Sequence, residues 1–187
     1  MRRHLTNMAR SAWKKHPSFN LRRLWEALST YESKVQAPEE TSQRWKRLTR
    51  GTVSKPLEVL LIEDNAGDIL LIHQVLAGER FPVSIHVAVD GKQAMQMLAA
   101  RQFEPDLVIL DLNLPKISGL SFLECTQPDV PVVVFTSSNN PLDRQSSFEL
   151  GAKDYVQKPT DLGEFAQVVS QMVRNWGYRE GIPRQAV

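Results

Sequence analysis

The sequence predicts a doubly wound α/β domain, in which five parallel strands form one sheet with helices on both of its faces. The first observation is that, from Leu57 onward, short apolar runs alternate five times with segments of helical period. The second is that runs such as "LVIL" and "VVVF" are apolar throughout, as expected for central parallel strands that are covered on both sides. A chain of 187 residues is long enough for one such domain and a smaller appendage.

The predicted elements follow one another in a regular order. The strands are "EVLLI" at 58–62, "VSIHVAV" at 83–89, "LVIL" at 107–110, "VVVFT" at 132–136 and "DYVQ" at 154–157. The helices are expected to start near Asp68, Gly91, Gly119, Leu142 and Thr160. Apolar residues at helical spacing define the inward face of the last helix, namely Phe165, Val168, Val169, Met172 and Val173. The segment "GLSFLECTQPDVP" leaves room for only a short third helix.

Charged and polar residues stand at the carboxyl ends of four of these strands. Glu63 and Asp64 follow the first strand, Asp111 follows the third, Thr136 closes the fourth, and Lys158 follows the fifth. Ligands of doubly wound sheets bind beyond these ends, where the strand order reverses. Two adjacent acids alone could mark a strand that emerges into solvent. Three carboxylates, a hydroxyl and an ammonium on one edge indicate a functional site.

The chemistry of this edge indicates phosphoryl transfer onto Asp111. Clustered carboxylates repel one another unless a hard divalent cation neutralises them, and Mg²⁺ prefers oxygen ligands while keeping several waters. Lys158 would face a phosphoryl group as a point charge, and Thr136 could donate a hydrogen bond to it. A carboxylate such as that of Asp111 can act as a nucleophile and form an acyl phosphate.

Residues 57–176 resemble the receiver domain of bacterial two-component response regulators. The pieces that carry the resemblance are, in order, "LLIEDNAGD", "LVILDLNLPKISGL", "VVVFTSS" and "DYVQKP". The resemblance implies a flavodoxin-like sheet with strand order 2-1-3-4-5, a receiver over 56–178 and a C-terminal tail at 179–187. The chain is most similar to stand-alone receivers, including those that serve bacterial phytochromes, and we expect no C-terminal output domain after Lys158.

The resemblance also implies a role for each residue of the site. Asp111 is the phosphoacceptor, Lys158 binds the phosphoryl group, Thr136 is the switch hydroxyl, and Tyr155 is the aromatic that reorients with it. A cis peptide is expected between Lys158 and Pro159. The protein is then not an enzyme but a phosphoacceptor that promotes its own phosphoryl transfer and hydrolysis. Tyr155 could otherwise be an ordinary aromatic of an edge strand, and Lys158 a solvated lysine of a turn.

The metal expected from the resemblance is Mg²⁺. Asp64, Asp111 and the backbone carbonyl of Asn113 are the implied ligands, and Glu63 acts on the metal through water. An aspartate-nucleophile phosphatase would need a second acid two residues after the nucleophile, where this chain has Asn113.

Residues 1–55 form a basic N-terminal extension. They hold 13 Lys and Arg against 4 Asp and Glu, a net charge of +9, whereas residues 56–187 carry −7. The piece "NLRRLWEALSTYESK" predicts an amphipathic helix. Two interpretations stay open: a helical or flexible regulatory arm, or upstream sequence read in front of a true start near Val53.

The expected partner is a sensor histidine kinase or a phosphotransfer protein, with output through a binding face at about 142–176. Trp176 and Tyr178 follow the last inward-facing residues, so they either fold back on their own helix or serve an interface. We predict a homodimer through roughly 142–178. The alternative function is a nucleic-acid-binding regulator that acts through the basic arm, with the receiver as scaffold.

Composition also bounds the location of the protein. No apolar run is long enough to cross a membrane, so no membrane partner is expected. The single cysteine, Cys125, excludes an intramolecular disulfide and suits a reducing compartment. We therefore expect a cytoplasmic protein.

Overall fold

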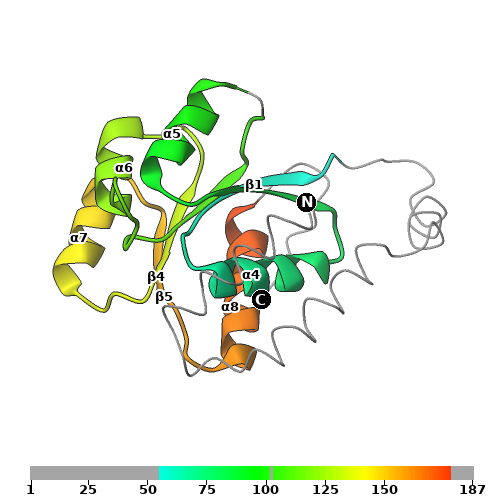
Figure 1. Cartoon of the computed structure of the whole chain (residues 1–187). Coiled ribbons are helices and arrows are strands. Elements are labelled where there is room, and N and C mark those ends of the chain that lie inside the picture. Colours follow the sequence, from blue (N-terminus) through cyan, green and yellow to red (C-terminus); the bar gives the residue numbers. More distant parts are fainter. Residues whose placement is uncertain (1–54, 102, 178–187) are drawn as a thin grey trace. The chain divides into compact units, whose positions relative to one another are not determined.

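The sheet is built as the sequence predicts. The computed structural model describes residues 55–101 and 103–177 (Figure 1). Five parallel strands pair in the order β2-β1-β3-β4-β5, which confirms the predicted order. Their bounds are Leu57–Ile62 for β1, Val83–Ala88 for β2, Leu107–Leu110 for β3, Val132–Thr136 for β4 and Asp154–Gln157 for β5. Because β2 lies on one side of β1 and the later strands lie on the other, the order reverses between β1 and β3.

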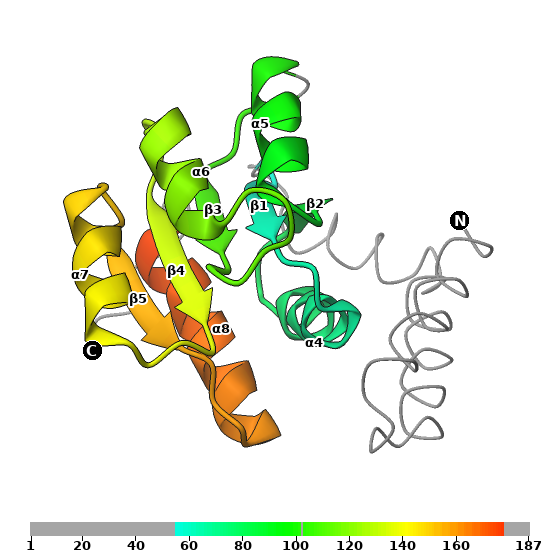
Figure 2. The same cartoon turned by 60° about the vertical axis from the view of Figure 1, so that its left-hand side comes forward.

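Helices alternate with the strands and cover both faces of the sheet. They are α4 at Ala66–Ala77, α5 at Gly91–Ala99, α6 at Gly119–Thr126, α7 at Pro141–Glu149 and α8 at Leu162–Trp176. Helices α4 and α8 pack side by side on one face, and α5, α6 and α7 cover the other (Figures 1 and 2). The third of them, α6, has eight residues and is as short as expected.

Each face of the sheet has its own apolar core. Successive residues of a strand point to opposite faces. Val59 and Leu61 of β1 therefore join the cluster under α4 and α8, whereas Leu60 and Ile62 join the cluster under α5 and α6. The predicted inward face of α8 is confirmed, since four of its residues are buried and Val168 is partly buried against the same cluster.

A polar side chain caps the amino end of every helix in the described part of the chain. The caps are Asn65, Asp90, Ser118, Asn140 and Asp161, and each accepts a backbone N–H of the first turn. The sequence placed Asp68 near the first cap. That cap is Asn65, and Asp68 lies in the first turn of α4, where its carboxylate is free to contact other elements.

The end of α8 packs on its own domain. The indole Nε1 of Trp176 donates to Asp154 Oδ2 at 3.3 Å, and the ring packs against the core under α4 and α8. The expected alternatives for Trp176 were packing on its own helix or serving an interface. The indole instead contacts β5 and the core of its own domain. Tyr178, the predicted amphipathic helix of the N-terminal extension and the tail at 179–187 lie outside the described residues. No helix in the described ranges has the length and apolar character needed to cross a membrane.

Candidate functional site

Three carboxylates meet at the carboxyl ends of β1 and β3, where the strand order reverses. Glu63 follows β1 and is 1% exposed, and Asp111 follows β3 and is 6% exposed. Asp64 is exposed. One carboxylate oxygen of each of these three acids lies within 4.8 Å of the other two. The backbone N–H of Asp111 donates to Ile62 O at 2.9 Å, so the sheet itself holds the third acid beside the first two.

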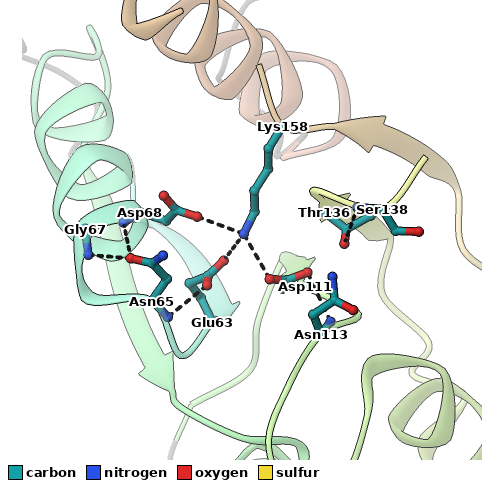
Figure 3. Close-up of polar contacts among 9 residues, drawn as sticks. All are labelled: Glu63, Asn65, Gly67, Asp68, Asp111, Asn113, Thr136, Ser138 and Lys158. Atoms are coloured by element: carbon teal, nitrogen blue, oxygen red, sulfur yellow. Dashed lines mark hydrogen bonds and ion pairs between the residues drawn. The ribbon is translucent and has the colours of Figure 1, made fainter. Parts of the chain in front are cut away.

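The ammonium of Lys158 lies among these acids (Figure 3). Its Nζ donates to Glu63 Oε2 at 2.6 Å, to Asp68 Oδ2 at 2.9 Å and to Asp111 Oδ2 at 3.0 Å. Its side chain is only 9% exposed. The backbone N–H of Lys158 donates to Thr136 O at 2.8 Å, which fixes the start of this side chain at the end of β4. The predicted edge lysine is therefore part of the site and not a solvated turn residue.

The peptide bond between Lys158 and Pro159 differs from the expectation. The part of the chain that the structure describes contains no cis peptide bond, so the expected cis peptide is wrong. Lys158 still points inward, because Thr136 holds its backbone and three carboxylates hold its ammonium. The trans form of an X–Pro bond is the preferred one by about 0.5–1 kcal/mol.

Burial and charge set the protonation of the site. Burial raises the pKa of the Glu63 carboxyl to about 7, although Lys158 opposes this shift, and the charge of Asp111 adds to it. Burial acts to lower the pKa of Lys158, but the charges of Glu63, Asp111 and Asp68 outweigh it and raise that pKa. Three acids, Glu63, Asp68 and Asp111, thus share one ammonium, and Asp64 adds a fourth negative charge beside them. Oxygen donors with surplus negative charge fit a hard divalent cation.

The other predicted residues surround Asp111 and the end of β4. The backbone N–H of Asn113 donates to Asp111 Oδ1 at 3.2 Å, which brings the loop after β3 beside the acid. Thr136 is fully buried, and its hydroxyl accepts the N–H of Ser138 at 3.3 Å. Tyr155 is 7% exposed, and its hydroxyl donates to Ser138 O at 3.0 Å. The backbone of Ser138 therefore joins Thr136 to Tyr155.

Two contributors were not predicted as site residues from the sequence. Asp68 was assigned to the start of a helix, but it binds Lys158. The sequence feature that could have indicated this role is an acid in the first turn of the helix that follows β1. That turn lies at the same end of the sheet as the other acids. Ser138 is the other, and no local sequence signal indicates its bond to Tyr155.

The fold and the site together define a class of protein. It is a doubly wound α/β domain with buried acids and a lysine at the point where the strand order reverses. The chain belongs to the response regulator receiver domain family, whose model matches residues 59–170, more than half of the chain. The resemblance drawn from the sequence is thus confirmed. Receiver domains belong to two-component systems, in which they interact with histidine kinases or phosphotransfer proteins.

Two solved structures are similar over most of their own length. The phosphorylated cyanobacterial phytochrome response regulator RcpA is 34% identical with a TM-score of 0.62, over 65% of this chain and 94% of that one. The Mn²⁺-bound form of response regulator Rcp1 is 32% identical with a TM-score of 0.62, over 68% of this chain and 99% of that one.

Curated relatives are similar over a comparable share of the chain. The transcriptional regulatory protein PrrA of Mycobacterium leprae is 34% identical over 128 residues, 67% of this chain and 53% of that one. The DNA-binding response regulator MtrA of Mycobacterium tuberculosis is 36% identical over 120 residues, 63% of this chain and 51% of that one. The chain thus spans about half the length of the curated relatives it matches.

Proposed function

We propose that this protein is a receiver whose Asp111 accepts a phosphoryl group from the phosphohistidine of a sensor histidine kinase or a phosphotransfer protein. The observation that carries the proposal is the buried Asp111 carboxylate, whose Oδ2 lies 3.0 Å from Lys158 Nζ. An oxygen of Asp111 would form the new bond to phosphorus as the bond from phosphorus to the histidine nitrogen breaks, and the imidazole leaves with that electron pair. Lys158 is placed to balance the charge of the phosphoryl oxygens.

The proposal includes Mg²⁺ as the cation. Asp64, Asp111 and the backbone carbonyl of Asn113 would hold it, with Glu63 acting through water. Bound there, Mg²⁺ would neutralise charge on the phosphoryl oxygens. The converging oxygens of Glu63, Asp64 and Asp111 support this assignment, and the similar response regulator Rcp1 has been solved in an Mn²⁺-bound form.

Output would pass through Thr136 and Tyr155 to a protein-binding face at 142–176. Movement of the Thr136 hydroxyl toward a phosphoryl group on Asp111 would break its bond with the Ser138 N–H. Because Ser138 also accepts from the Tyr155 hydroxyl, that change would reach Tyr155 and then the surface formed by α7 and β5. A cytoplasmic location remains part of this proposal, since that is where a reduced Cys125 and a kinase partner are expected.

Replacement of the acceptor tests the proposal. We expect Asp111→Asn to abolish labelling by acetyl phosphate in the presence of Mg²⁺, because an amide is not a nucleophile. Intact-mass spectrometry of the whole chain measures the label. Asp129→Asn, which changes an exposed acid elsewhere, is the matched control and should label like the parent. Labelling of the Asp111→Asn protein to the parent level would refute the proposal.

The basic N-terminal extension supports a second candidate, a nucleic-acid-binding regulator with the receiver as scaffold. The observation that supports this candidate is the net charge of +9 over residues 1–55, which would attract nucleic acid phosphates. Relatives such as MtrA are named as DNA-binding, but this chain spans about half of their length. Salt-dependent DNA binding that is lost when residues 1–52 are deleted would support this candidate. Equal binding with and without them would exclude it.

A further inference from the structure

The ammonium of Lys158 donates to three acids, two that belong to the cluster of converging carboxylates and one that does not. Glu63 and Asp111 belong to the three acids whose oxygens converge within 4.8 Å, whereas Asp68 does not. Figure 3 shows the ammonium between Asp68, on the side of α4, and Asp111, on the side of β3. The three donors of the ammonium are matched by three carboxylate oxygens.

The position of Asp68 is fixed by the start of α4. Asn65 Oδ1 accepts the backbone N–H of Gly67 at 2.8 Å and that of Asp68 at 3.4 Å. The N–H of Asn65 in turn donates to Glu63 Oε1 at 3.0 Å. The side chain of Asp68 is 23% exposed. Asp68 is therefore held at a set place relative to Glu63, on the rim of the site.

A cation held by Asp64 and Asp111, with Glu63 acting through water, would compete with Lys158 for the carboxylates of Asp111 and Glu63. The ammonium now bonds Glu63 Oε2 and Asp111 Oδ2, carboxylate oxygens of two residues of that group. A bound cation would also repel the ammonium. Among the described residues, Asp68 is the one carboxylate partner of Lys158 that lies outside the set, so it can keep the ammonium at the site when the other two bonds weaken.

We propose that Asp68 is a positioning residue that holds the Lys158 ammonium on the α4 side of the site, which leaves Glu63 and Asp111 accessible to a divalent cation and keeps the lysine beside the acceptor. This inference rests on the proposed function. It assigns Asp68 a role through Lys158 and not as a ligand of the metal.

A double-mutant cycle measured by calorimetric titration of the whole chain with Mg²⁺ tests the role. Asp68→Asn should weaken Mg²⁺ binding, because the freed ammonium then bonds more to Glu63 and Asp111. Loss of the Asp68 charge also weakens binding directly, in any background. We therefore expect the loss to be at least about threefold larger in the parent than in the Lys158→Met background, on the scale of a weak charge pair. Equal losses in both backgrounds would overturn the proposal.

Glu164 offers a matched control for the change of charge. It occupies the same third position of its helix, α8, and the helix is likewise capped by a carboxylate or amide oxygen, here of Asp161. Glu164 is exposed, and its neutralisation removes the same charge without touching Lys158. Glu164→Gln should leave Mg²⁺ affinity within about twofold of the parent. A loss as large as that of Asp68→Asn would show that net charge alone is responsible.

A second measurement does not depend on the folding of the Lys158→Met protein. Nitrogen-15 NMR detects lysine ammonium groups whose protons are protected from exchange. We expect the Lys158 signal to persist in the parent at saturating Mg²⁺ and to vanish in Asp68→Asn, where no carboxylate outside the metal set retains it. A signal that survives in Asp68→Asn would overturn the proposal. Labelling of Asp111 in the parent tests the proposed function separately, so the two failures are distinguishable.

Discussion

Lys158 balances the charge of the acids at the switch point. A buried carboxylate without a partner is costly, and this site brings Glu63 and Asp111 together with little access to solvent. Lys158 meets both, and its own side chain is nearly as buried as theirs. The same oxygens are therefore available either to an ammonium or to a metal. Because Lys158 neutralises these oxygens, the buried acids can lie close together in the folded protein before any cation binds.

The pKa of Glu63 predicts a pH dependence of stability in the metal-free protein. Burial raises this pKa from 4.5 to about 7, so the folded state holds a proton that the unfolded state has lost over that range. The free energy of unfolding should therefore fall as the pH rises from about 4.5 to about 7, and change little from this source above it. Glu63→Gln should remove this part of the slope. Urea denaturation in the presence of a chelator measures it, and identical slopes for parent and variant would contradict the assignment.

Asp64 and Glu63 should differ in their effect on metal binding. Asp64 is exposed and is the expected direct ligand, whereas Glu63 is expected to act through water. Asp64→Ala should weaken Mg²⁺ binding by more than about tenfold, the scale on which even supporting residues of metal sites act. Glu63→Gln should cost clearly less. Calorimetric titration at a pH above the Glu63 pKa measures both, and equal losses would mean that the two roles are assigned wrongly.

At the scale of the elements, the amino end of α6 lies directly against the strand end that carries Asp111. The N–H of Gly119 donates to Leu112 O at 3.1 Å. A Cβ at Gly119 would overlap the Asp111 carbonyl oxygen and lie 2.8 Å from Leu112 Cα. Both neighbours are backbone atoms, which cannot rotate away as a side chain can. Glycine is therefore needed here for space.

Gly119→Ala should destabilise the domain and disturb the acceptor loop. Backbone shifts of the kind that overpacking forces cost about 1–3 kcal/mol. Gly163→Ala is the control, because its Cβ would meet only the Asp161 side chain, at 3.1 Å. Urea denaturation of the whole chain compares the two. A Gly119→Ala protein as stable as Gly163→Ala would show that α6 can move away without cost.

The elements were largely predictable from the sequence, but contacts between distant elements were not. Apolar runs predicted every strand to within one residue of its observed bounds. Because the strands are parallel, their carboxyl ends lie at one side of the sheet, which predicted that Asp111 and Lys158 lie close together. The bond between Asp68 and Lys158 depends on how α4 is rotated against the sheet, which no local pattern states. The bond from Trp176 to Asp154 joins two residues 22 positions apart in the sequence, and no local pattern states it either. The trans peptide before Pro159 reflects a difference of about 1 kcal/mol or less that sequence does not resolve.

At the scale of the molecule, exposed apolar side chains support the predicted homodimer. Three large hydrophobic side chains of the described residues are exposed, and all lie within 142–178: Leu142 at 68%, Phe148 at 41% and Leu162 at 64%. Trp176 no longer supports an interface, because it packs on its own domain. The surface near α7 is also the one that a change at Tyr155 would reach, since Arg144 of α7 donates to Tyr155 O at 3.1 Å.

We therefore expect the chain to form dimers that beryllofluoride and Mg²⁺ tighten. Sedimentation of the whole chain, with and without the analogue, measures the association. Leu142→Asp should weaken it, because a charge would replace an exposed apolar side chain of the proposed face. Leu120→Asn, a partly buried position of α6 on another surface, is the comparison. A strict monomer on the order of tens of micromolar in both states would contradict the prediction.

The indole of Trp176 gives the receiver an intrinsic optical probe. Trp176 is the one tryptophan among the described residues, the others being Trp13, Trp25 and Trp45. Its ring bridges the end of α8 and the start of β5, at the edge of the sheet opposite to the acids. With the other three replaced by Phe, its emission would report on how α8 sits against β5. A shift in emission when beryllofluoride binds would then record that the signal has crossed the whole sheet, in a single cuvette and without any attached dye.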